Sequence, residues 1–146
     1  MLLKPKKFKN FIIKKNRLHG LNYNSKILTK GSYGLKALDY ARLTSKQIET
    51  VYMAINRMLN KQGRVYINIF PDISVTSKNI DSRMGKGKGD IKFWVCPIRP
   101  GKVLFEISDV YENIACTALT YGAAREIWYF YNGEISSIKP GETKKV

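Results

Sequence analysis

The spacing of hydrophobic residues predicts a long helix in the first half of the chain. From Thr44 to Gly63, in the stretch TSKQIETVYMAINRMLNKQG, apolar residues recur at i, i+3, i+4 and i+7, which places them on one helical face. Thr44 with Gln47 three residues later is the pattern of a capping box, and Gly63 suits a helix-ending position with positive φ. The residues expected to be buried on this face are Ile48, Val51, Tyr52, Ile55, Met58 and Leu59.

A second helix is predicted in the last third of the chain. It is expected to start near Asp109, with Glu112 three residues later, and to run through ENIACTALTYGAAREI. We interpret the two carboxylates as helix-capping groups rather than a catalytic pair, because negative charge is stabilised near the first turn of a helix. The residues expected on the buried side are Ile114, Ala118 and Leu119.

Alternation of apolar and polar residues predicts strands in four other places. Residues 31–43 contain a strand with Tyr33, Leu35 and Ala37 on one face, and RVYINIF points Val65, Ile67 and Ile69 inward before Pro71 ends it. Residues 91–98 and 103–108 are expected to pair as an antiparallel hairpin through a type II turn at Pro100 and Gly101. Another hairpin is predicted around Asn132 and Gly133.

The order of these elements predicts an α+β domain with two helices packed on a mostly antiparallel sheet. At 146 residues the chain is long enough to bury a hydrophobic core as one domain. We divide it into an extended basic N-terminal arm with at most a short strand or two (residues 1–30), a globular domain (31–125) and a C-terminal tail (126–146). The globular domain includes a basic Gly/Lys-rich loop without periodicity at residues 71–90.

Positive charge is concentrated in two segments. Lys and Arg number 26 against 11 acidic residues, for a formal net charge of +15. Residues 1–36 hold ten of these cations and no acid, and residues 78–102 hold seven cations against two acids. Such an excess suggests an anionic partner, with nucleic acid as the first candidate and a membrane surface as the second. The membrane is disfavoured because the basic segments are not amphipathic helices and no apolar run approaches the roughly 18 residues of a spanning helix.

The stretch SRMGKGKGD, residues 82–90, carries the clearest chemical signal. Its glycines permit close backbone approach and conformations closed to other residues, while Lys86 and Lys88 supply charge. A disordered linker is one alternative. A nucleotide-binding P-loop is another, but that motif needs Gly-Lys followed by Ser or Thr and a helix, whereas Asp90 and a predicted strand follow here. We interpret the loop as a finger that contacts a polyanion.

Other chemistries receive little support from the sequence. Cys96 and Cys116 are too few and too distant for a zinc pattern, and we interpret them as buried thiols of a reducing compartment. His19, the one histidine, lies in the basic arm without a nearby carboxylate, so it suits contact with a phosphate or a base better than general-base catalysis. We therefore expect a protein that is not an enzyme and has no metal site and no cofactor.

Four blocks of the sequence resemble a known family. GSYGLKALDYARLTSKQIE, VYINIFPDISVTSK, SRMGKGKGDIKFWV and RPGKVLFEI are similar, in order and spacing, to successive blocks of the universal large-subunit ribosomal protein family numbered sixteen, in its bacterial and organellar form. The resemblance runs from about residue 4 to residue 125, and the Arg-Met-Gly run before an aromatic-Trp-Val strand is its most specific part. Residues 126–146 depart from the family's usual ending.

The resemblance implies a fold and a set of partners. It implies a hammerhead-type β motif and a structural protein on large-subunit rRNA, near the aminoacyl-tRNA site and the peptidyl transferase region. Its implied partners are that rRNA, the aminoacyl-site tRNA and neighbouring large-subunit ribosomal proteins, with no membrane. A free-standing RNA-binding or RNA-modifying factor of the same fold is the alternative. The candidate rRNA- and tRNA-binding residues are Arg83, Met84, Gly85, Lys86, Gly87, Lys88 and Gly89 in the loop, and Lys6, Lys7, Lys9, Lys14, Lys15, Arg17 and His19 in the arm.

Composition suggests where such a protein would act. Lys outnumbers Arg by 19 to 7, and Ile, Asn and Tyr are abundant, which is the bias of an AT-rich genome. Together with the bacterial-type motifs, this bias suggests an organelle-encoded protein of the mitochondrial ribosome, in the matrix. A plastid or the cytoplasm of an AT-rich bacterium would give the same composition.

Overall fold

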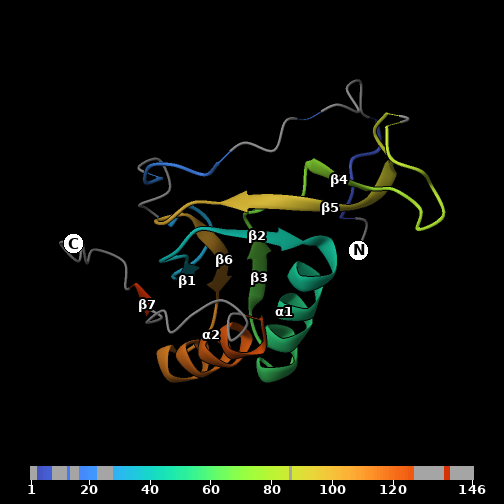
Figure 1. Ribbon diagram of the computed structural model, residues 1–146. Coiled ribbons are helices and arrows are strands. Elements are labelled where there is room, and N and C mark those ends of the chain that lie inside the picture. The colour runs from blue at the N-terminus through green and yellow to red at the C-terminus, as the bar shows by residue number, and fades with distance from the viewer. Residues whose placement is uncertain are drawn as a thin grey trace.

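The computed structural model describes residues 3–7, 13, 17–22, 28–85, 87–126 and 137–138. Within them the chain forms two helices and seven strands, which confirms the α+β class (Figure 1). The helices are α1 (Ser45–Met58) and α2 (Glu112–Glu126). The strands are β1 (Tyr33–Lys36), β2 (Ala41–Thr44), β3 (Arg64–Ile67), β4 (Ile73–Ser77), β5 (Asp90–Ile98), β6 (Val103–Ser108) and β7 (Ser137–Ile138).

Helix α1 begins where the sequence predicts it. The Thr44 hydroxyl accepts a hydrogen bond from the Gln47 backbone N–H at 3.3 Å, and the Gln47 side chain accepts one from the Thr44 N–H at 2.9 Å, so the capping box is complete. The helix ends at Met58 with Leu59 as its C-cap, and Asn60 follows with a left-handed φ of 47°. Gly63 has the predicted positive φ of 76°, but its predicted role as the helix-ending residue is wrong. The predicted apolar face of α1 packs against the core. Four of its residues are buried (Ile48, Val51, Ile55 and Leu59), and two are partly buried (Tyr52 and Met58).

Helix α2 starts three residues later than predicted. Asp109 has a left-handed φ of 62° and is not a helix residue, so its predicted role as the first residue of the helix is wrong. The buried side is confirmed for Ala118 and Leu119, while Ile114 is partly buried against the core. Gly122 lets α2 approach α1 closely, because a Cβ there would lie 2.6 Å from Ile55 Cγ1.

The predicted hairpin of residues 91–98 and 103–108 is wrong. The turn itself forms, with Gly101 at φ 91° and a hydrogen bond of 3.2 Å from the Lys102 N–H to the Arg99 carbonyl. The two strands then part, because Ala37 exchanges backbone hydrogen bonds with Gly101 and Lys102. Strand β6 pairs with β1 and β3 in a four-stranded sheet of order β3-β6-β1-β7, and β5 lies between β2 and β4 in a three-stranded sheet. The single sheet predicted from the sequence is thus two sheets, and the hammerhead-type motif stays a prediction.

Two short strands were missed by the sequence prediction. Strand β2 follows β1 after four residues, so residues 31–43 contain the start of a second strand rather than one strand alone. Strand β4 occupies part of the segment predicted as a loop at residues 71–90, and the loop is therefore confined to residues 78–89. In the described part of the arm at residues 3–7, 13, 17–22 and 28–30, no strand forms. The predicted Asn132–Gly133 hairpin lies outside the described residues, although β7 pairs with β1.

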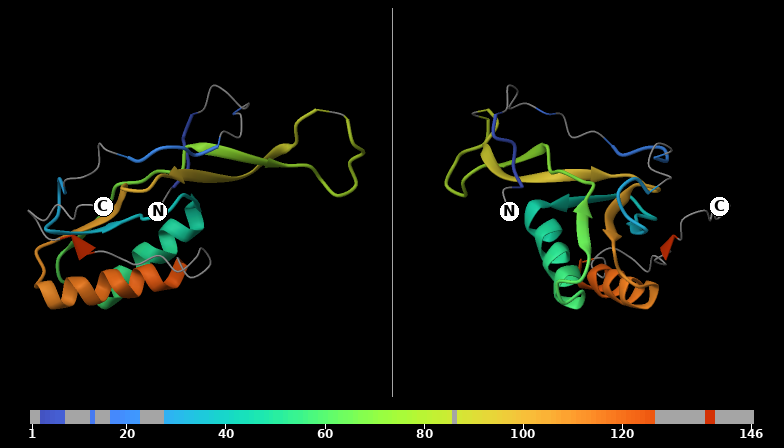
Figure 2. Two further views of the ribbon diagram at one scale, coloured as in Figure 1. Left: turned by 60° about the vertical axis from the view of Figure 1, so that its left-hand side comes forward. Right: turned by 180° about the vertical axis from the view of Figure 1, so that it is seen from behind.

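Both helices lie on one side of the three-stranded sheet, below β4 and β5 in Figure 1. The three-stranded sheet runs across the top, and the described arm residues 17–22 pass over its outer side, as both views of Figure 2 also show. The core between the helices and the sheets contains Leu35, Ile48, Ile55, Phe105, Ile107 and Leu119. One face of the three-stranded sheet is therefore free of helices.

Replacing Ile55 with alanine should test this packing. Ile55 is fully buried between the two helices, so an Ile55→Ala variant is expected to lose about 3 kcal/mol of unfolding free energy through lost burial and the cavity left behind. Urea denaturation of the full chain measures this loss. A Met53→Ala variant is the control, because Met53 lies on the same helix and is 55 % exposed. Equal midpoints for Ile55→Ala and the wild type would contradict the assigned face.

Candidate nucleic-acid interface

The loop of residues 78–89 projects from a paired base. Strands β4 and β5 form an antiparallel hairpin that reaches Ser77 and Asp90, and Figure 2 shows the loop extending beyond the sheets and helices. Arg83 and Met84 are exposed on it, Met84 to 97 %. Because Met84 does not pack inside the loop, the side chains of Arg83 and Met84 are both available to a partner.

The three glycines of the loop have different structural roles. Gly85 and Gly87 have φ of 100° and 82°, in a region that disfavours other residues, and a Cβ added at either glycine would have no described neighbour within 4 Å. Gly89 instead lies against the backbone of Ser77, where a Cβ would be 2.6 Å from the carbonyl carbon. Gly85 and Gly87 therefore shape the open tip, whereas Gly89 allows the loop to close at its base.

The arm lies against the outer face of the three-stranded sheet and meets the loop. The Lys88 Nζ donates to the Ile13 carbonyl at 3.4 Å, the Asn22 N–H donates to the Pro100 carbonyl at 2.8 Å, and the Tyr40 hydroxyl donates to the Gly20 carbonyl at 3.2 Å. The first two contacts join basic segments that are far apart in the sequence, and the arm meets the loop at Lys88.

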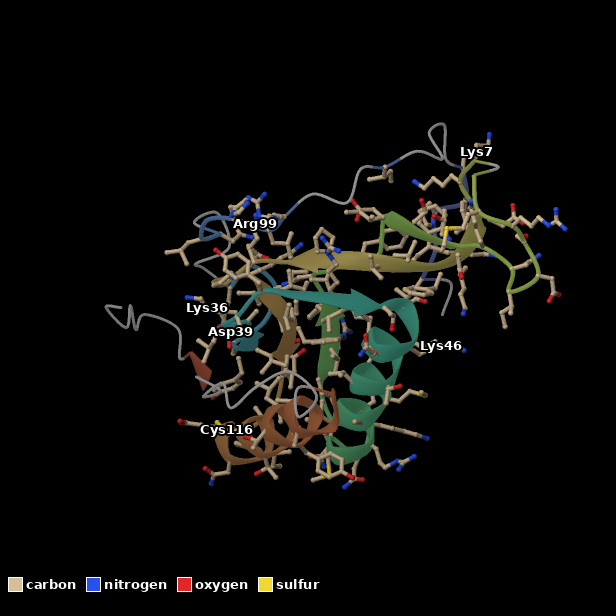
Figure 3. The ribbon with its side chains drawn as sticks, viewed as in Figure 1. Lys7, Lys36, Asp39, Lys46, Arg99 and Cys116 are labelled. Atoms are coloured by element: carbon tan, nitrogen blue, oxygen red, sulfur yellow. The ribbon has the colours of Figure 1, made fainter. Side chains whose placement is uncertain are left out.

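The other predicted binding residues are distributed over this side of the molecule. Arg17, His19, Lys6 and Lys7 are exposed, and Figure 3 places Lys7 on the side of the three-stranded sheet away from the helices. Exposure leaves their cationic or imidazole groups accessible to an anion. Four predicted residues lie outside the described part of the chain: Lys9, Lys14, Lys15 and Lys86.

Two arginines on this side were missed by the sequence prediction. Arg42 of β2 pairs with Pro97 of β5, and Arg99 follows Pro97 by two residues, so both arginines point to the outer face of the sheet. Arg99 is exposed at the end of β5 (Figure 3). The alternation of Arg42 with Ala41 and Leu43 was a usable signal, but pairing it with Arg99 required the register of the sheet.

A buried carboxylate fixes the inner end of the arm. Glu106 is 1 % exposed on β6, and its Oε2 accepts hydrogen bonds from the N–H groups of Thr29, Lys30 and Gly31 at 3.2, 2.6 and 2.8 Å. Its Oε1 accepts from Asn68 Nδ2. Burial alone would raise the pKa of Glu106, but these hydrogen bonds outweigh burial and hold the pKa below its ordinary value. The ionised form thus anchors the arm where it enters β1.

Other sites receive no support from the described residues. Cys96 is buried on β5 and Cys116 is partly buried on α2, and both are free thiols. Burial raises the pKa of Cys96 above its ordinary value, although the nearby positive charge of Lys102 acts to lower it. In the described ranges no group of three or more His, Cys, Asp or Glu side chains could hold a metal ion. Neither of the two described helices is long and apolar enough to cross a bilayer.

A projecting glycine loop, a basic arm and two outward arginines are typical of the class of proteins that bind a nucleic acid. Within that class, the family model described as Ribosomal protein L16p/L10e matches residues 5–125. The chain belongs to this ribosomal protein family, as the resemblance of its four sequence blocks indicated.

Similar proteins from bacteria cover most of the chain. The large ribosomal subunit protein uL16 of Chelativorans sp. (strain BNC1) is 47 % identical over 124 residues, which are 85 % of this chain and 90 % of that protein. The protein of the same name from Caulobacter vibrioides (strain NA1000 / CB15N) is 47 % identical over 85 % of this chain and 87 % of its own length. That from Bartonella quintana (strain Toulouse) is 44 % identical over 85 % and 90 %. The loop and the described arm residues from 5 onward lie within the family match.

Proposed function

We propose that the protein is a structural constituent of the large ribosomal subunit that binds large-subunit rRNA and neighbouring ribosomal proteins. The relatives at 47 % identity carry the name large ribosomal subunit protein uL16, and the similarity extends over 85 % of this chain. In this role the folded body is a scaffold, and the arm and loop neutralise phosphates that would otherwise repel one another. The protein acts without catalysis.

One observation carries the proposal at the level of the structure. The loop projects from the paired strands β4 and β5 with exposed Arg83 and Lys88, and its open tip is shaped by Gly85 and Gly87. Such a loop can enter a narrow space between RNA segments, because its glycines have no side chains to exclude the backbone from phosphates. The strand pairing at the base of the loop and the hydrogen bond between Lys88 and the arm are not expected of a simple linker.

We extend this proposal to tRNA, location and domain roles. The loop and arm, with Arg17 and His19 among their exposed residues, help position tRNA at the aminoacyl site near the peptidyl transferase region. The ribosome concerned is mitochondrial, on the basis of the Lys-rich, Arg-poor composition. Residues 1–30 act as the RNA-binding arm, 31–125 as the folded body, and 126–146 as a tail specific to this chain.

Sedimentation of the protein in its own cell extract tests the ribosomal assignment. We expect the native chain to travel with large subunits through a density gradient and to stay with them after a moderate salt wash. Alanine at Lys78, Arg83 and Lys88 should release it into the light fractions, because these exposed loop cations contact phosphates.

The control removes an equal charge elsewhere. Alanine at Lys46, Arg57 and Arg64 changes three exposed cations of α1 and β3, and this variant should remain bound. A native chain found entirely in the light fractions would favour a free-standing RNA-binding factor and contradict the ribosomal proposal. Equal release of the two variants would show that net charge, and not the loop, holds the protein.

A further inference from the structure

A hollow of about 370 Å³ lies between the arm and the outer face of the three-stranded sheet. Four cationic residues line it, and they come from four different segments: Arg17 of the arm, Arg42 of β2, Lys88 of the loop and Arg99 after β5. No acidic residue is among the described residues that line it. The excess of cations around the hollow gives it a positive potential, which suits it to an anion.

The floor of the same hollow is mainly apolar, with Ser74 and Thr76 of β4 as its polar members. Val95 and Pro97 of β5 share the outer face with Ile73, which pairs with Val95, and Leu18 of the arm closes the hollow from the other side. Val95 is only 4 % exposed, and Arg17 and Leu18 of the arm line the same hollow. A free phosphate ion would contact only the cations and would make no contact with the apolar side chains of the floor.

A cationic rim over an apolar floor matches the two parts of a nucleotide. An unstacked base is planar and largely apolar on its faces, and proteins commonly hold it against apolar side chains or arginine guanidinium planes. Its phosphate carries the negative charge that Arg42 and Arg99 would bind. The volume falls within the usual range of small-ligand sites, which is about 300 to 1,000 Å³.

We propose that this hollow binds one unstacked nucleotide of the RNA, with the base on the apolar floor and the phosphate between Arg42 and Arg99. The inference rests on the proposed function, since it specifies how the protein recognises its RNA. It also assigns roles to Arg42 and Arg99, which lie outside the glycine loop. The site is specific for an unpaired position, because a base in a duplex is stacked and cannot enter the hollow.

Titration of the isotope-labelled full chain with mononucleotides tests the proposal by NMR. Adenosine and uridine 5′-monophosphate are the probes, and ribose 5-phosphate is the control with the same charge and no base. We expect the nucleotides to shift the amide signals of Ile73, Val75 and Val95, and ribose 5-phosphate to bind at least about tenfold more weakly. Equal binding of ribose 5-phosphate would overturn the base site and leave only an anion site.

Matched variants separate this site from general charge. Arg42→Ala and Arg99→Ala should each weaken nucleotide binding about tenfold through loss of a charge-assisted contact. Lys46→Ala removes an equal charge on α1 and should leave it unchanged; Figure 3 places Lys46 and Arg99 at opposite sides of the view. Equal weakening by all three variants would overturn the proposal.

A parallel measurement of large-subunit rRNA binding by the wild-type chain separates failure of the nucleotide site from failure of the proposed function. If the chain binds this rRNA but neither nucleotide, the hollow is not a nucleotide site and the proposed function stands. If it binds neither the rRNA nor the nucleotides, the proposed function fails together with this inference. Filling the hollow by Val75→Trp should abolish nucleotide binding while the loop contacts keep the rRNA bound.

Discussion

A Glu106→Leu variant is expected to lose about 4 kcal/mol of unfolding free energy. Leucine has a similar size, but it leaves the partly buried N–H groups of Lys30 and Gly31 and the Asn68 amide without their acceptor, and a buried donor left unpaired costs about 1–3 kcal/mol. The arm should loosen at its junction with β1 as a result. Urea denaturation gives the free energy, and amide exchange at Lys30 and Gly31 reports the local loosening.

Glu106→Gln is the control, and its effect should depend on pH. Glutamine keeps an acceptor oxygen but no charge, so the expected loss at neutral pH is smaller, about 2 kcal/mol. The pKa of Glu106 lies below its ordinary value of 4.5 in the folded chain, so its stabilising effect is complete above that value and is lost as the pH falls through the lowered pKa. The difference between wild type and Glu106→Gln should therefore shrink under acid conditions. A difference that stays constant across this range, or an unchanged midpoint for Glu106→Leu, would contradict the anchor.

The second large effect is expected from Gly87→Val in reconstituted large subunits. Gly87 has a φ of 82°, and a β-branched residue in this conformation is strained by roughly 1–2 kcal/mol or takes up another conformation. The net charge is unchanged, yet the tip should no longer fit its RNA, and we expect incorporation into subunits to fall at least about tenfold. The free chain should keep its melting temperature, because the exposed tip can relieve the strain by taking up another conformation, and a Cβ at Gly87 would have no described neighbour within 4 Å.

Two further loop variants separate shape from charge. Lys88→Ala should weaken RNA binding modestly and lower the slope of its salt dependence by about 1, as for one lost phosphate contact. Gly89→Ala should instead destabilise the β4–β5 hairpin, since its Cβ would overlap the Ser77 backbone.

For the Gly87→Val variant, incorporation into subunits and tRNA binding at the wild-type level would show that the loop is a solvated linker.

Local chemistry made some elements predictable from the sequence. The capping box at Thr44 and the apolar face of α1 depend on residues three and four positions apart, so the sequence contains the whole signal. The turn at Pro100 and Gly101 is equally local, and it forms as predicted. The glycine loop was also predictable as an exposed feature, because its composition cannot form a core.

Pairings between distant segments were not predictable in the same way. A turn between residues 98 and 103 suggested a hairpin, but Ala37 takes the backbone hydrogen bonds next to that turn and directs the two strands into different sheets. The joint position of Arg42 and Arg99 follows from that topology. The role of Glu106 could not be predicted, because an isolated acidic residue in an apolar strand does not indicate which backbone amides it will bind. Here it binds three amides of the arm, which are distant in sequence.

A structure of intact large subunits that contain this chain would show directly which of its surfaces meets the rRNA. We expect the loop of residues 78–89 and the outer face with Arg42 and Arg99 to lie against rRNA, with phosphates within hydrogen-bonding distance of Arg83 and Lys88. Helices α1 and α2 should face away from these contacts. A subunit in which the helices meet the rRNA and the loop lies in solvent would contradict the proposed role of the loop in RNA binding.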